Sequence, residues 1–102
     1  MEAWIEIART DELLPETALE RIVEERVIAL FHVDGEFFAL DGICPHQGGP
    51  LGQGNLEGFV IRCPWHGWSF DVRSGQCGLS DQICQKTYAV RVQDQRIFIR
   101  LE

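Results

Sequence analysis

The chain has 102 residues, and its 9 Lys and Arg against 16 Asp and Glu give a formal net charge of −7. This length accommodates one hydrophobic core, and the hydrophobic share of 45% is ordinary for a folded domain. The acidic balance argues against nucleic acid and anionic membrane surfaces as partners, because both require clustered basic residues.

The first residues, "MEAWIEIARTDE", contain neither a basic start nor an apolar run of signal-peptide length. No later stretch approaches the length of a membrane span. We therefore expect a cytoplasmic, unanchored protein. In that compartment four cysteines are ligands or free thiols rather than disulfides.

The predicted elements are mostly β-strands, and the first covers residues 3–8. The one helical signal is "TDELL" at residues 10–14, where Thr10 can cap a single turn and Pro15 ends it. This short turn does not change the prediction of an all-β chain.

Two hairpins are predicted next. "VIALFHV" (27–33) and "EFFAL" (36–40) are joined by Asp34-Gly35, and both central residues of the favoured hairpin turn need positive φ. Residues 20–24 precede them and are expected to pair with the first of these strands across a short acidic turn.

The chain ends in a further predicted hairpin, formed by residues 87–92 and 96–100. Residues 42–78 differ from the rest because they are rich in Gly, Pro and aromatic residues and poor in strand alternation. We interpret this segment as a loop-built insertion on a β scaffold, within a single domain that covers residues 1–102.

The insertion contains a doubled pair of metal-ligating residues, Cys44 with His46 and Cys63 with His66. Two thiolates and two imidazoles suit zinc or an iron–sulfur centre. A structural zinc site usually uses arms that each hold two cysteines or two histidines, whereas here each arm offers one of each. This arrangement favours a two-iron centre, in which one iron takes both cysteines and the other takes both histidines.

The pattern Cys44-x-His46, sixteen residues, then Cys63-x-x-His66 with Gly67 directly after it resembles the Rieske [2Fe-2S] motif. "CPHQGGPLGQG" and "CPWHGWSFD" are similar to the two cluster loops of that family. The resemblance implies an antiparallel β-sandwich or barrel-like Rieske fold with a small loop-built cluster-binding subdomain. It also implies one [2Fe-2S] cluster held by these two cysteines and two histidines.

The mixed ligand set predicts a raised reduction potential. Two ferric ions, two sulfides and two thiolates sum to zero charge, which moves the potential from roughly −400 mV into the range of about −150 to +300 mV. High-potential respiratory members of the family carry a disulfide between the loops and hydroxyl donors to the cluster. Gly49, Trp65, Trp68 and Phe70 occupy those positions here, so we expect the low end of the range.

The resemblance to soluble Rieske ferredoxins implies a one-electron carrier with no catalytic site of its own. Its expected partners are a flavin-dependent reductase and a terminal oxygenase, in transient docking. The alternative is the small subunit of an NAD(P)H nitrite reductase, bound to the large subunit. A zinc-stabilised interaction module is the third reading. An independent oxygenase is not expected, because only His32 remains as a ligand for another iron.

The residues around the motif have less specific interpretations. Leu51, Trp65 and Trp68 either shield the cluster from water or simply pack the subdomain. Cys77 and Cys84 are expected to be free thiols, with a shared disulfide as the alternative.

Overall fold

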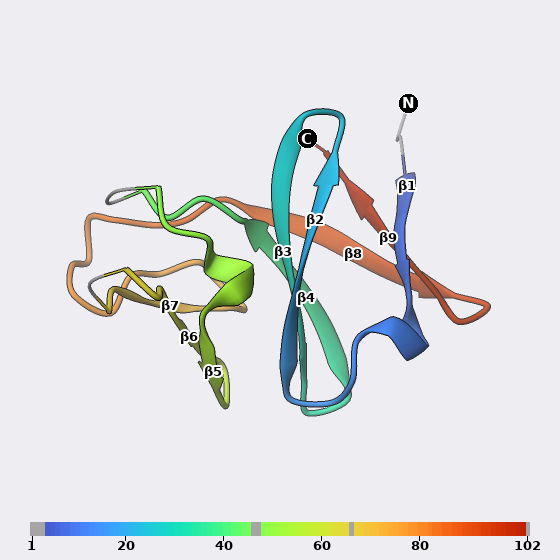
Figure 1. The fold of residues 1–102 in the computed structure, drawn as a ribbon, viewed down its shortest axis with the longest axis horizontal. Coiled ribbons are helices and arrows are strands. Elements are labelled where there is room, and N and C mark those ends of the chain that lie inside the picture. The colour runs from blue at the N-terminus through green and yellow to red at the C-terminus, as the bar shows by residue number, and fades with distance from the viewer. Residues whose placement is uncertain (1–3, 46–47, 66, 102) are drawn as a thin grey trace.

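The computed structural model describes residues 4–45, 48–65 and 67–101. Two antiparallel sheets, which form a half-barrel, make up this part of the chain (Figure 1). The larger sheet has six strands in the order β1-β9-β8-β4-β3-β2. Its strands are β1 (Trp4–Arg9), β2 (Thr17–Val23), β3 (Arg26–Val33), β4 (Glu36–Asp41), β8 (Thr87–Gln93) and β9 (Arg96–Arg100).

The three predicted hairpins are confirmed. In each hairpin the strands meet at two residues with positive φ, as the two-residue turns of twisted hairpins require. The pairs and their angles are Glu24 and Glu25 (50° and 69°), Asp34 and Gly35 (54° and 78°), and Asp94 and Gln95 (53° and 66°). The last turn therefore adopts the hairpin geometry without a glycine.

Strand β3 has a continuous apolar run over residues 27–31 because both of its faces are buried there. Ala29, Phe31 and Val33 point into one hydrophobic core, whereas Ile28 and Leu30 point into another. Successive side chains of a strand point to opposite faces, so a strand between two cores needs a continuous apolar run rather than alternation. β3 thus forms the wall that the two cores share.

The smaller sheet lies within the segment that was interpreted as loop-built. It consists of β5 (Asn55–Glu57), β6 (Val60–Arg62) and β7 (Ser69–Asp71), paired in that order. These strands were not predicted from the sequence, because three residues are too few to show a period of two. Two single-turn 3-10 helices, η1 (Thr10–Glu12) and η2 (Leu51–Gln53), complete the elements.

The predicted cap of η1 is wrong by one residue. Arg9, not Thr10, occupies the N-cap, and its backbone N–H donates to the Glu12 carboxylate at 2.7 Å. Ends of such short turns are set by the side chain that reaches back to them, which the sequence pattern did not identify.

The small sheet is inserted between two neighbouring strands of the large one. The chain leaves at the end of β4 and returns in β8, and these strands pair at Ala39–Tyr88 and Leu40–Thr87. Figure 1 shows the inserted unit to one side of the large sheet, away from the β8–β9 hairpin. No helix in residues 4–45, 48–65 and 67–101 is long and apolar enough to cross a membrane.

Candidate metal centre

The two cysteines of the doubled pair begin two matching turns. The Cys44 N–H donates to the Gly49 carbonyl at 2.8 Å, and the Cys63 N–H donates to the Trp68 carbonyl at 2.7 Å. In both cases the acceptor lies five residues after the cysteine. The repetition in the sequence is therefore a repetition of backbone geometry, with one turn after β4 and the other after β6.

A glycine with positive φ precedes the acceptor in each turn, Gly48 at 80° and Gly67 at 75°. In the sequence, each turn also contains one of the predicted histidine ligands. His46 and His66 lie outside the described residues, so their prediction as ligands stays a prediction. Both arms therefore reverse the chain between a cysteine and a glycine.

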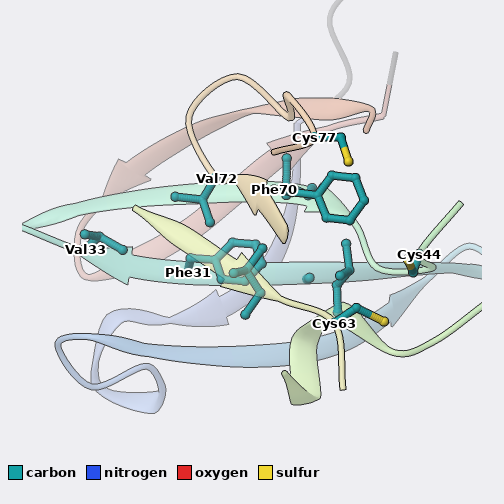
Figure 2. Close-up of a cluster of buried hydrophobic side chains, with 11 residues drawn as sticks. Phe31, Val33, Cys44, Cys63, Phe70, Val72 and Cys77 are labelled. Atoms are coloured by element: carbon teal, nitrogen blue, oxygen red, sulfur yellow. The ribbon is translucent and has the colours of Figure 1, made fainter. Parts of the chain in front are cut away.

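The Cys44 and Cys63 thiols are buried, with 1% and 2% of each residue exposed, and both are free. They belong to the hydrophobic core on one side of β3 (Figure 2). A Cβ atom at Gly49 would lie 2.6 Å from the Cys63 sulfur. The first arm therefore contacts the second through a glycine, and any larger residue would displace the Cys63 thiol.

The Cys63 thiol has a backbone donor. The Trp65 N–H donates to its sulfur at 3.4 Å. Burial raises the pKa of Cys63, the Trp65 N–H lowers it, and the nearby Cys44 thiol raises it again, with a net raised pKa. Without a cation the thiol holds its proton at neutral pH, and a bound metal ion would displace that proton.

The side chains around the thiols divide into a buried wall and an exposed rim. Leu51 and Phe70 are buried in the same core, and Trp68 packs against it. Trp65 is 49% exposed. An open hollow of about 450 Å³ has Cys63 and Gly67 in its lining. Leu51 and Trp68 therefore pack the subdomain, whereas the Trp65 ring is left partly in solvent.

The remaining cysteines are also free, so the alternative of a disulfide between Cys77 and Cys84 is wrong. Cys77 is buried in the core that holds Cys44 and Cys63, and its sulfur accepts a hydrogen bond from the Leu79 N–H at 3.4 Å. Cys84 is exposed.

Within the described residues, which leave out His46 and His66, no group of three or more His, Cys, Asp or Glu side chains is arranged to hold a metal ion. His32 has a structural role, because its Nδ1 is hydrogen-bonded to the Leu13 carbonyl at 2.9 Å and its ring stacks on Phe37. His32 is therefore a residue of the β scaffold.

Sequence reasoning missed Gln85. Its buried side chain donates to backbone carbonyls next to the first arm. Gln85 lies in the mostly polar stretch "SDQICQKT", and nothing in this stretch distinguishes it from Gln82 or indicates such a role.

Comparison with known proteins was made for the family and for individual relatives. The family model described as the Rieske [2Fe-2S] domain matches residues 3–96. The ferredoxin component of a naphthalene 1,2-dioxygenase system from Pseudomonas putida is 37% identical over 100 residues. This alignment covers 96% of this chain and 95% of the relative.

Two solved structures are similar over the whole fold. The Sphingomonas yanoikuyae B1 ferredoxin is 29% identical, with a TM-score of 0.89 over 98% of this chain and 100% of the other. A chain in the complex of reduced oxygenase and oxidized ferredoxin in carbazole 1,9a-dioxygenase is 25% identical, with a TM-score of 0.87 over 100% of this chain and 96% of the other.

Proposed function

We propose, because the chain belongs to the Rieske [2Fe-2S] domain family, that it carries single electrons from a flavin-dependent reductase to the terminal oxygenase of a dioxygenase system. The cofactor of this family is a [2Fe-2S] cluster, which accepts and releases one electron when it is bound. The observation that carries the proposal is the pair of matching turns that bring two buried, free thiols together.

The described part of the site fits such a cluster. Thiolates are the ligands that iron–sulfur clusters use, and Cys44 and Cys63 supply two of them from separate arms. The space beside the Cys63 sulfur exists only because Gly49 has no side chain. We propose that Cys44, His46, Cys63 and His66 are the four ligands.

The chain's own residues contribute more than ligands. Leu51 and Phe70 exclude water from the inner side of the thiols. The Trp65 N–H donates to the Cys63 sulfur, and such donors stabilise a reduced centre. Because the positions after the second arm offer no hydroxyl at Trp68 or Phe70, we propose a potential at the low end of the Rieske range.

The relatives support the carrier rather than the nitrite reductase subunit. The Pseudomonas putida protein is a ferredoxin component of a dioxygenase system, and the carbazole structure joins a ferredoxin to an oxygenase. Transient redox encounters use small interfaces, and a chain of net charge −7 is attracted to basic patches on its partners.

We further propose that the chain forms one functional domain over residues 1–102, with the cluster-binding part at about residues 42–78. It has no catalytic site of its own and acts in the cytoplasm. The absence of a catalytic site is supported by the contacts of His32 with Leu13 and Phe37, because they give this histidine a structural role in the scaffold. The free thiols support a reducing compartment.

The test is iron and acid-labile sulfide analysis of anaerobically prepared protein, followed by reduction and electron paramagnetic resonance. We expect two irons and two sulfides per chain and the low average g-value of a mixed Cys/His cluster. The variants His46→Ala and His66→Ala should lose this spectrum, whereas the control His32→Ala should keep it. A colourless chain with one zinc ion, or an unchanged spectrum after either ligand substitution, contradicts the proposal.

A further inference from the structure

Gln85 is a buried polar residue at the junction between the large sheet and the inserted unit. It is 6% exposed, and no other polar or charged residue in the described parts of the chain is buried to this degree. A buried amide must find hydrogen-bond partners, because an unpaired buried donor destabilises the fold. The partners that Gln85 finds show what it holds in place.

Its side chain donates two hydrogen bonds to the chain that leads into the first arm. Nε2 donates to the Asp41 carbonyl at 2.8 Å and to the Ile43 carbonyl at 2.6 Å. Asp41 is the last residue of β4, and Ile43 directly precedes Cys44. The bond to Asp41 has an ordinary N–H···O length, and the bond to Ile43 is slightly shorter than the usual range.

These bonds continue the pairing of β4 with β8 beyond the end of the strands. The regular partners are Ala39–Tyr88 and Leu40–Thr87, and the Asp41 N–H then donates to the Lys86 carbonyl at 2.9 Å. At the next step the backbone of the first arm turns away from β8. The Gln85 side chain spans this separation, and it links the first arm to the chain that precedes β8 at the point where the backbone pairing ends.

The bond to Ile43 fixes the peptide group from which Cys44 projects. The carbonyl of the Ile43–Cys44 peptide accepts from Gln85, while its N–H donates to the Gly49 carbonyl at 2.8 Å. A planar peptide that is held at both ends has little freedom to rotate. The direction of the Cys44 side chain is therefore set by Gln85 on one side and by the turn on the other.

The backbone of Gln85 contacts the turn that follows β7. Its N–H donates to the Gly75 carbonyl at 2.7 Å, and the Gly75 N–H donates to the carbonyl of Asp71, the last residue of β7, at 2.7 Å. A Cβ atom at Gly75 would lie 2.0 Å from the Gln85 carbonyl oxygen, so the approach requires glycine. One residue thus touches the chain that leads into Cys44 and the turn after β7, the strand that pairs with β6 directly before Cys63.

We propose that Gln85 is a positioning residue for the metal centre: its amide holds the peptide group before Cys44, and its backbone holds the turn after β7, the strand that pairs with β6 directly before Cys63. The relative placement of the two thiols, and with it the retention of the cluster, depends on this residue. The inference rests on the proposed function, because it takes Cys44 and Cys63 as ligands.

The test compares Gln85→Met, Gln85→Asn and the control Gln76→Met in the cluster-loaded protein. Methionine keeps the length of glutamine without a donor, and asparagine is one methylene shorter, so that it reaches at most one carbonyl. Gln76 is a matched control, because its Nε2 donates to the carbonyls of Ser80 (2.8 Å), Ile83 (3.2 Å) and Cys77 (3.4 Å), none of which lies in the chain that leads into Cys44.

Two measurements separate positioning from general stability. The first is the rate at which a strong iron chelator bleaches the visible spectrum. We expect this rate to rise by about 10–100-fold in Gln85→Met, as for other residues that orient metal ligands, and by less in Gln85→Asn. The second is hydrogen–deuterium exchange of peptides that cover residues 41–45, which should become faster in the same order. Gln76→Met should match the wild-type chain in both.

Bleaching of Gln85→Met at the wild-type rate, or unchanged exchange at residues 41–45, would overturn the proposal. An equal acceleration in Gln76→Met would do the same, since the effect would then be general loosening. If Gln85→Met does not fold, the comparison of Gln85→Asn with Gln76→Met decides. A wild-type chain that takes up neither iron nor sulfide would overturn the proposed function instead, a result that no behaviour of the Gln85 variants imitates.

Discussion

Gly49 is the residue at which the first arm touches the sulfur of the second. A methyl group there would lie 2.6 Å from the Cys63 Sγ and 3.1 Å from the Trp65 Cβ. Overpacking of this kind costs about 1–3 kcal/mol, and here it pushes directly on a proposed ligand. We expect Gly49→Ala to hold less iron and sulfide per chain than the wild type, as measured by chemical analysis after anaerobic purification.

Gly58 provides the control for this substitution. It has a φ of 58°, so Gly58→Ala strains the backbone, which Gly49→Ala does not, but a Cβ atom at Gly58 meets nothing within 4 Å. This variant should keep the wild-type iron content at a somewhat lower melting temperature. Equal iron loss in both variants would show that a general loss of stability, not contact with the sulfur, controls the iron content.

Glu12 gives the fold a pH dependence that is independent of the metal centre. The Arg9 N–H, and then Arg21, lower the pKa of the Glu12 carboxyl below its ordinary value of 4.5. The charged carboxylate therefore stabilises the fold above pH 4.5, and this contribution is lost as the pH falls through the lower pKa of the folded state.

Removal of Arg21 should raise the pKa of Glu12 but leave it below 4.5, because the Arg9 N–H still donates to the carboxylate. A carbon-13 NMR titration of the Glu12 carboxyl in wild type and Arg21→Ala measures this shift. Arg26→Ala, which removes a cation that donates to the Leu101 carbonyl instead, should leave the titration unchanged. A wild-type pKa at or above 4.5 contradicts the assignment.

At the level of single residues, the sequence predicted the metal-binding side chains better than the residues that hold them in position. The doubled Cys–His pattern marked Cys44 and Cys63, and the structure brings these thiols together in one core. The prediction of Gln85 was out of reach, because its role depends on a contact with Ile43, which lies 42 residues away along the chain. A long-range hydrogen bond leaves no period and no motif in a single sequence.

Among the elements, hairpins were predictable and the small sheet was not. Asp34-Gly35 is a dipeptide typical of two-residue hairpin turns, and the flanking apolar runs are long enough to be recognised as strands. β5, β6 and β7 have three residues each and are stabilised by the core they cover, in which Ile61 and Phe70 are fully buried or nearly so. Their formation depends on tertiary packing, which local propensity does not encode.

The two-faced burial of β3 predicts different effects for neighbouring substitutions. Leu30 and Phe31 are both fully buried, but Phe31 points into the core that contains the cysteines and Leu30 into the other core. Leu30→Ala and Phe31→Ala should each lower the free energy of unfolding, by about 2–5 kcal/mol. In Phe31→Ala the cavity lies in the core that contains Cys44 and Cys63.

Denaturant titrations followed by far-ultraviolet circular dichroism and by visible absorbance separate the two cases. In Leu30→Ala we expect the cluster to bleach together with the loss of the sheet. In Phe31→Ala bleaching should come at a lower denaturant concentration than the loss of the sheet. Coincident transitions in Phe31→Ala would mean that the two cores do not act separately on the metal centre.

At the scale of the whole molecule, the insertion places the metal centre at one end. The chain leaves β4 and returns in β8, so the inserted unit that contains both cysteines projects from two paired strands, while the β8–β9 hairpin lies at the opposite end (Figure 1). The sequence predicted this plan as a β scaffold with an insertion at about residues 42–78, but the pairing of β4 with β8 was not predicted, because those strands are far apart in the sequence.

This polarity predicts where a redox partner makes contact. Trp65 is 49% exposed beside the Cys63 turn, and an exposed tryptophan is the kind of side chain that anchors an interface. Trp65→Ala keeps the backbone N–H that donates to the Cys63 sulfur, so the cluster content and the spectrum should stay close to wild type. Electron transfer to the terminal oxygenase should slow by about fivefold or more, since truncation of such an anchor costs more than about 1 kcal/mol.

Val92 is similarly exposed, at 47%, in the strand that enters the opposite hairpin, and stopped-flow measurements should find Val92→Ala as fast as the wild type. Equal rates for Trp65→Ala and Val92→Ala would place the contact away from the cysteine arms.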